Sequence, residues 1–82
     1  MDQVAIRLMK TEAETMRRQA TSIGELAIQD IQASNFQQAA SHAAECQGYV
    51  EAARRLDALA NYMIEVLDAL EIVKNALDDN HE

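Results

Sequence analysis

The sequence predicts an all-α protein, a two-helix antiparallel hairpin that assembles into an oligomeric helical bundle. Three observations lead to this fold class. The 82 residues include no Pro and only two Gly, so the turns that an all-β domain needs roughly every 8–12 residues are missing. Apolar residues recur at alternating spacings of three and four along most of the chain, the period of a helix packed along one side. One short polar break near residue 34 divides this pattern in two.

The first helix is expected over about 2–33, as part of a single helical domain over residues 1–82. Gly24 lies inside it, at a cost of about 1 kcal/mol relative to Ala. Ser22 and Glu25 have the spacing of a capping box, so a break at Ser22 is an alternative. The apolar pattern nevertheless keeps its phase through this point. The seam, the stripe expected to face the partner helix, consists of Ile6, Met9, Ala13, Met16, Ala20, Ile23 and Ala27.

A turn at about 34–35 and a second helix over about 36–78 follow. Ser34 or Asn35 is expected to cap the second helix, with Gln37 or Gln38 three residues later. Gly48 offers a place for a kink, so a monomeric three-helix bundle is an alternative. The predicted seam shifts its phase locally after Ala53, where an extra step of three occurs. It consists of Phe36, Ala39, Ala43, Cys46, Val50, Ala53, Leu56, Ala60, Met63, Leu67, Leu70, Val73 and Leu77.

The second helix has more apolar surface than one neighbour can cover. At about 1.5 Å per residue the helices are roughly 48 and 63 Å long, so the second overhangs by two or three turns. A two-helix hairpin of this size usually needs a disulfide, a metal or a partner, and we expect a homo-oligomer, most simply a four-helix dimer. The predicted oligomer interface, here called the C-terminal stripe, consists of Leu59, Tyr62, Met63, Val66, Leu67, Ala69, Leu70, Ile72 and Val73.

The charge is −7, with seven Lys and Arg against fourteen Asp and Glu. Residues 1–18 are slightly basic, and the acidic excess lies from residue 19 onward. This balance disfavours direct binding of nucleic acid, whose phosphates attract basic surfaces. It favours contact with another protein through the acidic face or the basic N-terminal end. The candidate partner-binding residues are Arg17, Arg18, Glu65, Asp68 and Glu71.

No set of residues in the sequence indicates catalysis or a cofactor. Cys46 and His42 are one helical turn apart, but the two isolated glycines form neither an oxyanion-hole turn nor a phosphate loop. His42 and Glu45 reverse the Glu-x-x-His order of di-iron bundles. We therefore predict a non-enzymatic protein without cofactors. A small ligand- or metal-binding bundle around His42, Glu45 and Cys46 is the alternative.

The same sequence predicts a cytoplasmic protein. A single Cys excludes an internal disulfide. No apolar run reaches the ~18 residues of a membrane span, and no signal peptide is visible. We therefore expect no contact with a membrane.

Two segments carry a resemblance to a known class. Residues 35–40 read Asn-Phe-Gln-Gln-Ala-Ala, and residues 46–54 read Cys-Gln-Gly-Tyr-Val-Glu-Ala-Ala-Arg. Together they resemble the hairpin region of small helical accessory proteins of bacteriophages and prophages. The resemblance implies a role in virion assembly or in binding and inhibiting a host or defence protein. It assigns no catalytic residue.

Overall fold

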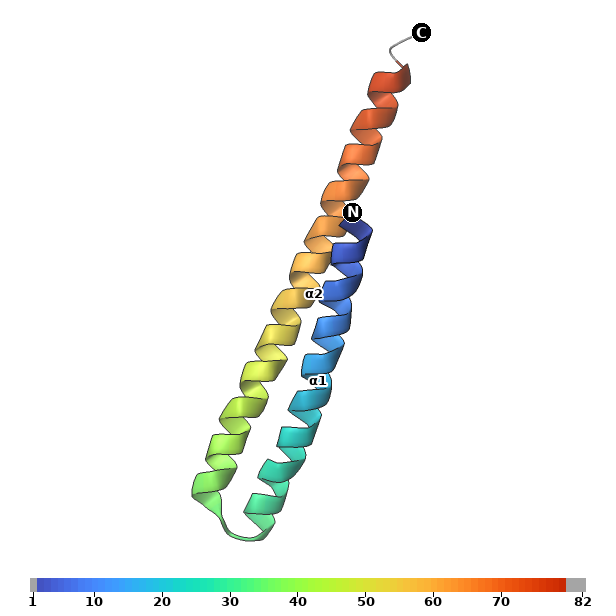
Figure 1. Ribbon diagram of the computed structural model, residues 1–82. Coiled ribbons are helices and arrows are strands. Elements are labelled where there is room, and N and C mark those ends of the chain that lie inside the picture. Colours follow the sequence, from blue (N-terminus) through green and yellow to red (C-terminus); the bar gives the residue numbers. More distant parts are fainter. Residues whose placement is uncertain (1, 80–82) are drawn as a thin grey trace.

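The computed structural model describes residues 2–79 and confirms the all-α hairpin. Helix α1 spans Asp2–Gln32 and helix α2 spans Phe36–Asp79. The two helices lie side by side and antiparallel, joined by a tight turn at one end of a long rod (Figure 1). Over the described residues the rod measures 74 × 15 × 13 Å.

Both helices are unbroken, so the alternatives with an additional break are wrong. α1 continues through Ser22 and Gly24, and α2 continues through Gly48. A single Gly costs a helix about 1 kcal/mol relative to Ala, which is too little to end a helix of 44 residues that lies against a neighbour. The capping-box spacing at Ser22 is not used, because the seam of α1 keeps one phase through it.

The turn combines a C-terminal cap of α1 with a side-chain contact at the start of α2. Ser34 has a φ of 59°, and its N–H and that of Asn35 donate to the carbonyls of Ile31 and Asp30 at 3.0 and 2.7 Å. These two bonds define a Schellman motif. Asn35 then precedes α2, and its Nδ2 donates to Oε1 of Gln38 at 2.8 Å. The expected cap, in which the Ser34 or Asn35 side chain accepts from a backbone N–H of α2, is not formed: the Asn35 side chain donates to the Gln38 side chain instead.

The seam of α1 is confirmed, but the predicted seam of α2 is wrong at two positions in its middle and at both of its ends. Ala43 and Val50 are exposed, and the half-buried residues next to them are His42 and Tyr49. The steps of three and four therefore continue without the predicted phase shift. The observed seam of α2 consists of Ala39, His42, Cys46, Tyr49, Ala53, Leu56, Ala60, Met63 and Leu67. The prediction failed because it chose the apolar residue at each of these two positions. The helix instead keeps its period and places His42 and Tyr49 in the seam.

The first and last parts of the predicted α2 seam also lie outside the helix contact. Phe36, beside the turn, is 65% exposed, and Leu70, Val73 and Leu77 are more than half exposed. Leu70 and the residues after it have no α1 beside them. The prediction assumed that the first helix runs beside these residues, but α1 does not extend that far along α2.

From Ala13 to Ala27 in α1 and from Ala39 to Ala60 in α2, small residues occupy every second position of the seam. Among the residues whose burial the structure describes, the fully buried apolar ones are all alanines, and no large side chain is fully buried. Larger residues such as Met16, Ile23 and Leu56 alternate with them and stay half-buried. The seven-residue repeat of small side chains runs through Ala13, Ala20 and Ala27 in α1 and through Ala39, Cys46, Ala53 and Ala60 in α2.

α2 extends well beyond the start of α1 (Figure 1). It has 44 residues against 31, a difference of about 20 Å at 1.5 Å per residue. Across the hairpin, Lys10 contacts Asn61 and Arg17 contacts Asp57. This register places the first residue of α1 close to residue 69. Residues 70–79, here called the overhang, therefore stand alone, as the sequence predicted.

Candidate functional site

The C-terminal stripe divides between the hairpin seam and the open surface. Met63 and Leu67 are half-buried against α1. The other seven residues are exposed, from 38% for Val66 to 69% for Ile72. The stripe therefore begins beside the paired part of the hairpin and continues onto the overhang. Its exposed members form an apolar surface that the hairpin itself does not cover.

A shallow hollow of about 240 Å³ lies on this surface. We call it the stripe hollow; its lining is Tyr62, Met63, Val66, Leu67 and Leu70. All five were predicted as interface residues. The structure thus brings these residues of the stripe together in a concave patch at the level where α1 begins.

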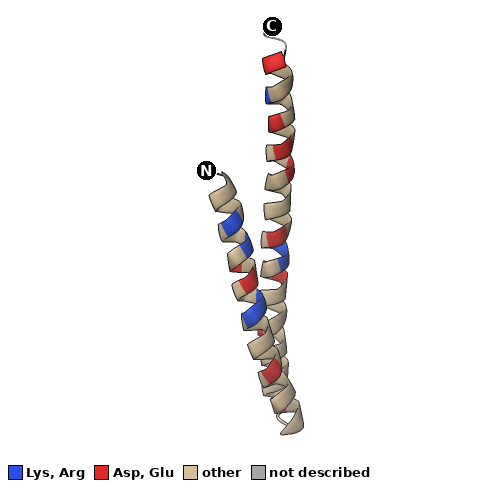
Figure 2. Ribbon diagram, turned by 90° about the vertical axis from the view of Figure 1, so that its right-hand side faces the viewer, with Lys and Arg blue, Asp and Glu red and all other residues tan. Residues whose placement is uncertain are grey.

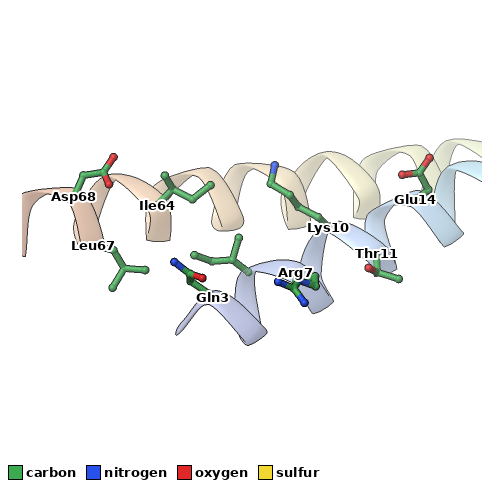
Figure 3. Close-up of a pocket in the computed structure, with 9 residues that line it drawn as sticks. Gln3, Arg7, Lys10, Thr11, Glu14, Ile64, Leu67 and Asp68 are labelled. Carbon is green, nitrogen blue, oxygen red and sulfur yellow. The ribbon is translucent and has the colours of Figure 1, made fainter. Parts of the chain in front are cut away.

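A second, larger hollow lies between the start of α1 and α2, and the sequence did not indicate it. Its volume is about 510 Å³. We call it the N-terminal groove; it is lined by Gln3, Ile6, Arg7, Lys10, Thr11, Glu14, Ile64, Leu67 and Asp68 (Figure 3). Leu67 lines both hollows, so the two lie on either side of it. The slightly basic N-terminal end was the only signal in the sequence for this groove.

The predicted partner-binding residues do not form one cluster. Arg17 Nη1 lies 2.6 Å from Asp57 Oδ2, so it joins α1 to α2 in an ion pair that the sequence did not reveal. Asp68 lines the N-terminal groove. Arg18, Glu65 and Glu71 are exposed. Figure 2 shows Lys and Arg gathered in the N-terminal half of α1 and acidic residues along the C-terminal half of α2.

The residues of the metal-binding alternative are engaged in hairpin contacts. His42 Nδ1 lies 2.6 Å from Asp30 Oδ2, with both side chains mostly buried. Cys46 Sγ donates to the carbonyl of Ala20 at 3.2 Å, and Glu45 is exposed. Within residues 2–79 no group of three His, Cys, Asp or Glu side chains is placed to hold a metal ion. The ligand-binding alternative stays a prediction without a converging set of ligands.

Large apolar side chains are exposed along the whole rod. Fifteen of them are exposed in the described part of the chain, although single exposed apolar residues are common in folded proteins. What stands out is their continuity on α2, where Leu59, Tyr62, Val66 and Leu70 follow one another. Neither α1 nor α2 contains a stretch apolar enough to cross a membrane.

Comparisons with known proteins add no relative to this picture. No family model, no curated protein and no solved structure matches the chain.

Proposed function

We propose that this protein is a non-enzymatic protein–protein interaction module, an acidic helical hairpin that associates with itself through the C-terminal stripe. One observation supports this proposal above the others. The hairpin fully buries only alanines, while large apolar side chains stay half-buried or exposed. A buried methyl contributes about 0.8 kcal/mol, against about 1.5–3 kcal/mol for a fully buried Leu. The large apolar side chains, whose burial would contribute the most free energy, are therefore those that a partner would cover.

A dimer interface of standard size would cover a small part of the hairpin surface. Interfaces of this kind bury about 800 Å² on each partner, about an eighth of the 6374 Å² that the hairpin exposes. The C-terminal stripe includes Tyr62, and Tyr is enriched at interfaces because it joins an apolar ring to a polar tip. The acidic outer surface keeps the assembly soluble and offers a second face to a basic partner.

The biological part of the proposal rests on the resemblance of residues 35–54 to phage accessory proteins. We propose that the hairpin acts in the cytoplasm of a bacterial host, in virion assembly or by binding and inhibiting a host or defence protein. Tagged protein, purified from infected cells, separates the two roles. An assembly subunit sediments with the particles, whereas an inhibitor is recovered in a soluble complex with one partner in fixed proportion.

The self-association is tested by the mass of the protein in solution. Light scattering at micromolar concentration is expected to give at least 18 kDa, twice the 9.1 kDa of one chain. Val66→Asp places a carboxylate in the stripe, where burial without a partner is costly, and is expected to give 9 kDa. Gln47→Asp changes an exposed residue outside the stripe and serves as the matched control. A wild-type mass of 9 kDa, or a Val66→Asp mass equal to the wild type, contradicts the proposal.

A further inference from the structure

Five exposed residues of the C-terminal stripe, together with Ala76, form a second helical seam on α2. They follow one another at alternating steps of three and four, and none of them is charged. This is the spacing of a helix that packs along one side against another helix. All six are exposed, so the hairpin itself does not cover them. We call this set the second seam; it consists of Leu59, Tyr62, Val66, Ala69, Val73 and Ala76.

The stripe hollow has the arrangement of a hole in a coiled coil. Four of the residues that line it follow the spacing i, i+3, i+4 and i+7 along α2, namely Met63, Val66, Leu67 and Leu70. Four residues of one helix form such a hole, which receives one side chain of a facing helix. All of the lining residues belong to α2, so α1 does not supply that side chain. The hollow therefore fits a further helix that lies along α2.

The second seam is complementary to itself when two copies of α2 run antiparallel. A two-fold axis between residues 67 and 68 then brings each smaller side chain of the seam opposite a larger one. Facing positions that join a large and a small side chain fill the space between two helices evenly. A parallel pair would instead place each residue opposite its own copy, Tyr against Tyr and Ala against Ala. The facing pairs of the antiparallel arrangement are Leu59 and Ala76, Tyr62 and Val73, and Val66 and Ala69.

The antiparallel arrangement also gives the overhang a neighbour. Leu70 and Leu77 are 58 and 59% exposed, and each follows directly after a residue of the second seam. The same axis places Leu70 at the level of Met63 of the other copy, where the stripe hollow lies. Leu70 is therefore the large side chain that enters this hollow. In a parallel pair the two overhangs would lie beside each other, beyond both α1 helices (Figure 1).

Charge favours the antiparallel arrangement as well. The overhang has one basic residue against three acidic ones, a net charge of −2, and a parallel pair would place two such segments side by side. In the antiparallel pair their centres are about 20 Å apart along the axis, more than twice the screening length of about 8 Å at physiological salt. Each overhang lies instead beside the end of the other hairpin where the Lys and Arg of α1 gather (Figure 2).

We propose that two copies associate through an antiparallel pair of α2 helices, with second seam on second seam and Leu70 of each copy in the stripe hollow of the other. This inference rests on the proposed self-association and adds its orientation and register. The overlap covers residues 59–76, about 27 Å of each α2, and the two turns point in opposite directions. Glu71 and Asp78 lie about half a turn of helix away from the second seam, so they stay on the outer surface. The N-terminal groove, on the other side of Leu67, also stays open.

A disulfide between two full-length chains tests the register. Cys46, the only cysteine, is first replaced by Ala, and Tyr62→Cys and Val73→Cys are then made in separate chains. The proposed register makes these two positions face each other, but it separates each from its own copy by about 16 Å along the axis. A disulfide needs Cα atoms about 4.4–6.8 Å apart. After oxidation, the mixture is therefore expected to contain at least tenfold more cross-linked dimer than either variant alone.

The matched control for this cross-link is Asn75→Cys in place of Val73→Cys. Asn75 is exposed and lies on another side of α2, so its mixture with Tyr62→Cys is expected to stay uncross-linked.

A second measurement leaves the second seam unchanged. A spin label is attached to Gln47→Cys in the Cys46→Ala chain, at an exposed position outside the stripe. The antiparallel pair separates the two labels by about 60 Å along the axis. A parallel pair keeps them within about 30 Å, because neighbouring helices lie about 8–10 Å apart. Light scattering checks that every cysteine variant is still dimeric, and if one is not, the label distance alone decides.

The outcomes separate the two proposals. A monomeric wild-type protein overturns both the proposed function and the antiparallel arrangement. Cross-linking of each variant with itself, or a label distance within about 30 Å, indicates a parallel pair; it overturns the antiparallel arrangement and leaves self-association intact. A wild-type dimer in which dimeric Tyr62→Cys and Val73→Cys do not cross-link has the same consequence. Cross-linking confined to their mixture, together with a label distance of about 60 Å, supports the proposed pair.

Discussion

At the scale of single residues, the seam contains one polar pair that the apolar pattern hid. His42 and Asp30 face each other across the turn end of the hairpin, with side chains 20 and 16% exposed. Nδ1 and Oδ2 lie 2.6 Å apart, within hydrogen-bond distance, and a proton on Nδ1 is the one that the imidazole can donate to the carboxylate. At these two facing positions of the seam, where two apolar residues are usual, the hairpin has a His and an Asp.

We predict that His42→Ala destabilises the hairpin by about 1–3 kcal/mol, because it leaves a mostly buried carboxylate without its donor. Asp30→Ala alone is expected to have a similar effect. The double variant should lose less than the sum, since it removes both members of the pair. Urea unfolding of the four proteins measures the coupling. Strict additivity would show that the pair contributes nothing beyond packing.

The turn depends on a serine in a conformation that favours glycine. Ser34 has a φ of 59°, which costs a residue with a Cβ atom roughly 1–2 kcal/mol. Ser34→Gly is therefore predicted to stabilise the hairpin by about 1 kcal/mol. Ser41→Gly, within α2, serves as the opposite control and should destabilise by a few tenths of a kcal/mol to 1 kcal/mol. Thermal unfolding of both variants checks the prediction, and a lower melting temperature for Ser34→Gly contradicts it.

At the scale of the helices, the alanines set how closely α1 and α2 approach. Ala53 is 2% exposed on the seam, whereas Ala58 on the same helix is exposed. Ala53→Leu adds a large side chain where no space exists and is predicted to cost about 1–3 kcal/mol. Ala58→Leu should be nearly neutral, because Leu and Ala have similar helix propensities. Denaturant unfolding distinguishes the two; equal stability of the variants would contradict close packing at Ala53.

The pattern of apolar residues was sufficient for α1 and for the existence of the hairpin. In α1 every seam residue from Ile6 to Ala27 is apolar, so the helical period and the apolar character select the same positions. In α2 the two criteria select different positions at His42 and Tyr49. The helical period decides which residues face α1, because a straight helix cannot change its phase for one side chain. Strict alternation of steps of three and four backward from Met63, through Ala60, Leu56 and Ala53, would have found both residues.

The candidate site was predictable only in its apolar part. The five residues that line the stripe hollow were all expected at an interface, because two apolar stripes on one helix imply two neighbours. The N-terminal groove needed the register of the hairpin, which decides which residues of α1 lie opposite Ile64 and Leu67. That register is visible in cross-helix contacts such as Arg17–Asp57, and these contacts cannot be predicted from the composition or from the period of the apolar residues.

At the scale of the whole molecule, the proposed association and the folding of the hairpin are linked. A partner that binds only the folded chain stabilises it by mass action, so the melting temperature should rise with protein concentration. We predict an increase of roughly 3–6 °C for each tenfold increase in concentration. Calorimetry over two decades of concentration measures it. Val66→Asp should remove the dependence, and a wild-type melting temperature independent of concentration contradicts the prediction.

The position of the turn also determines the order in which the hairpin closes. Asp30 and His42 are 12 residues apart in the chain, whereas Lys10 and Asn61 are 51 apart. Because the entropy lost on closing a loop grows with its length, contacts between α1 and α2 should form first beside the turn and last at the start of α1. Within the paired part of the hairpin, backbone amides at the start of α1 should then exchange their hydrogens faster than those beside the turn, since opening of the helix pair begins there. The N-terminal groove exists only when this last segment is closed, so the groove forms last during folding and is lost first when the end of the hairpin opens.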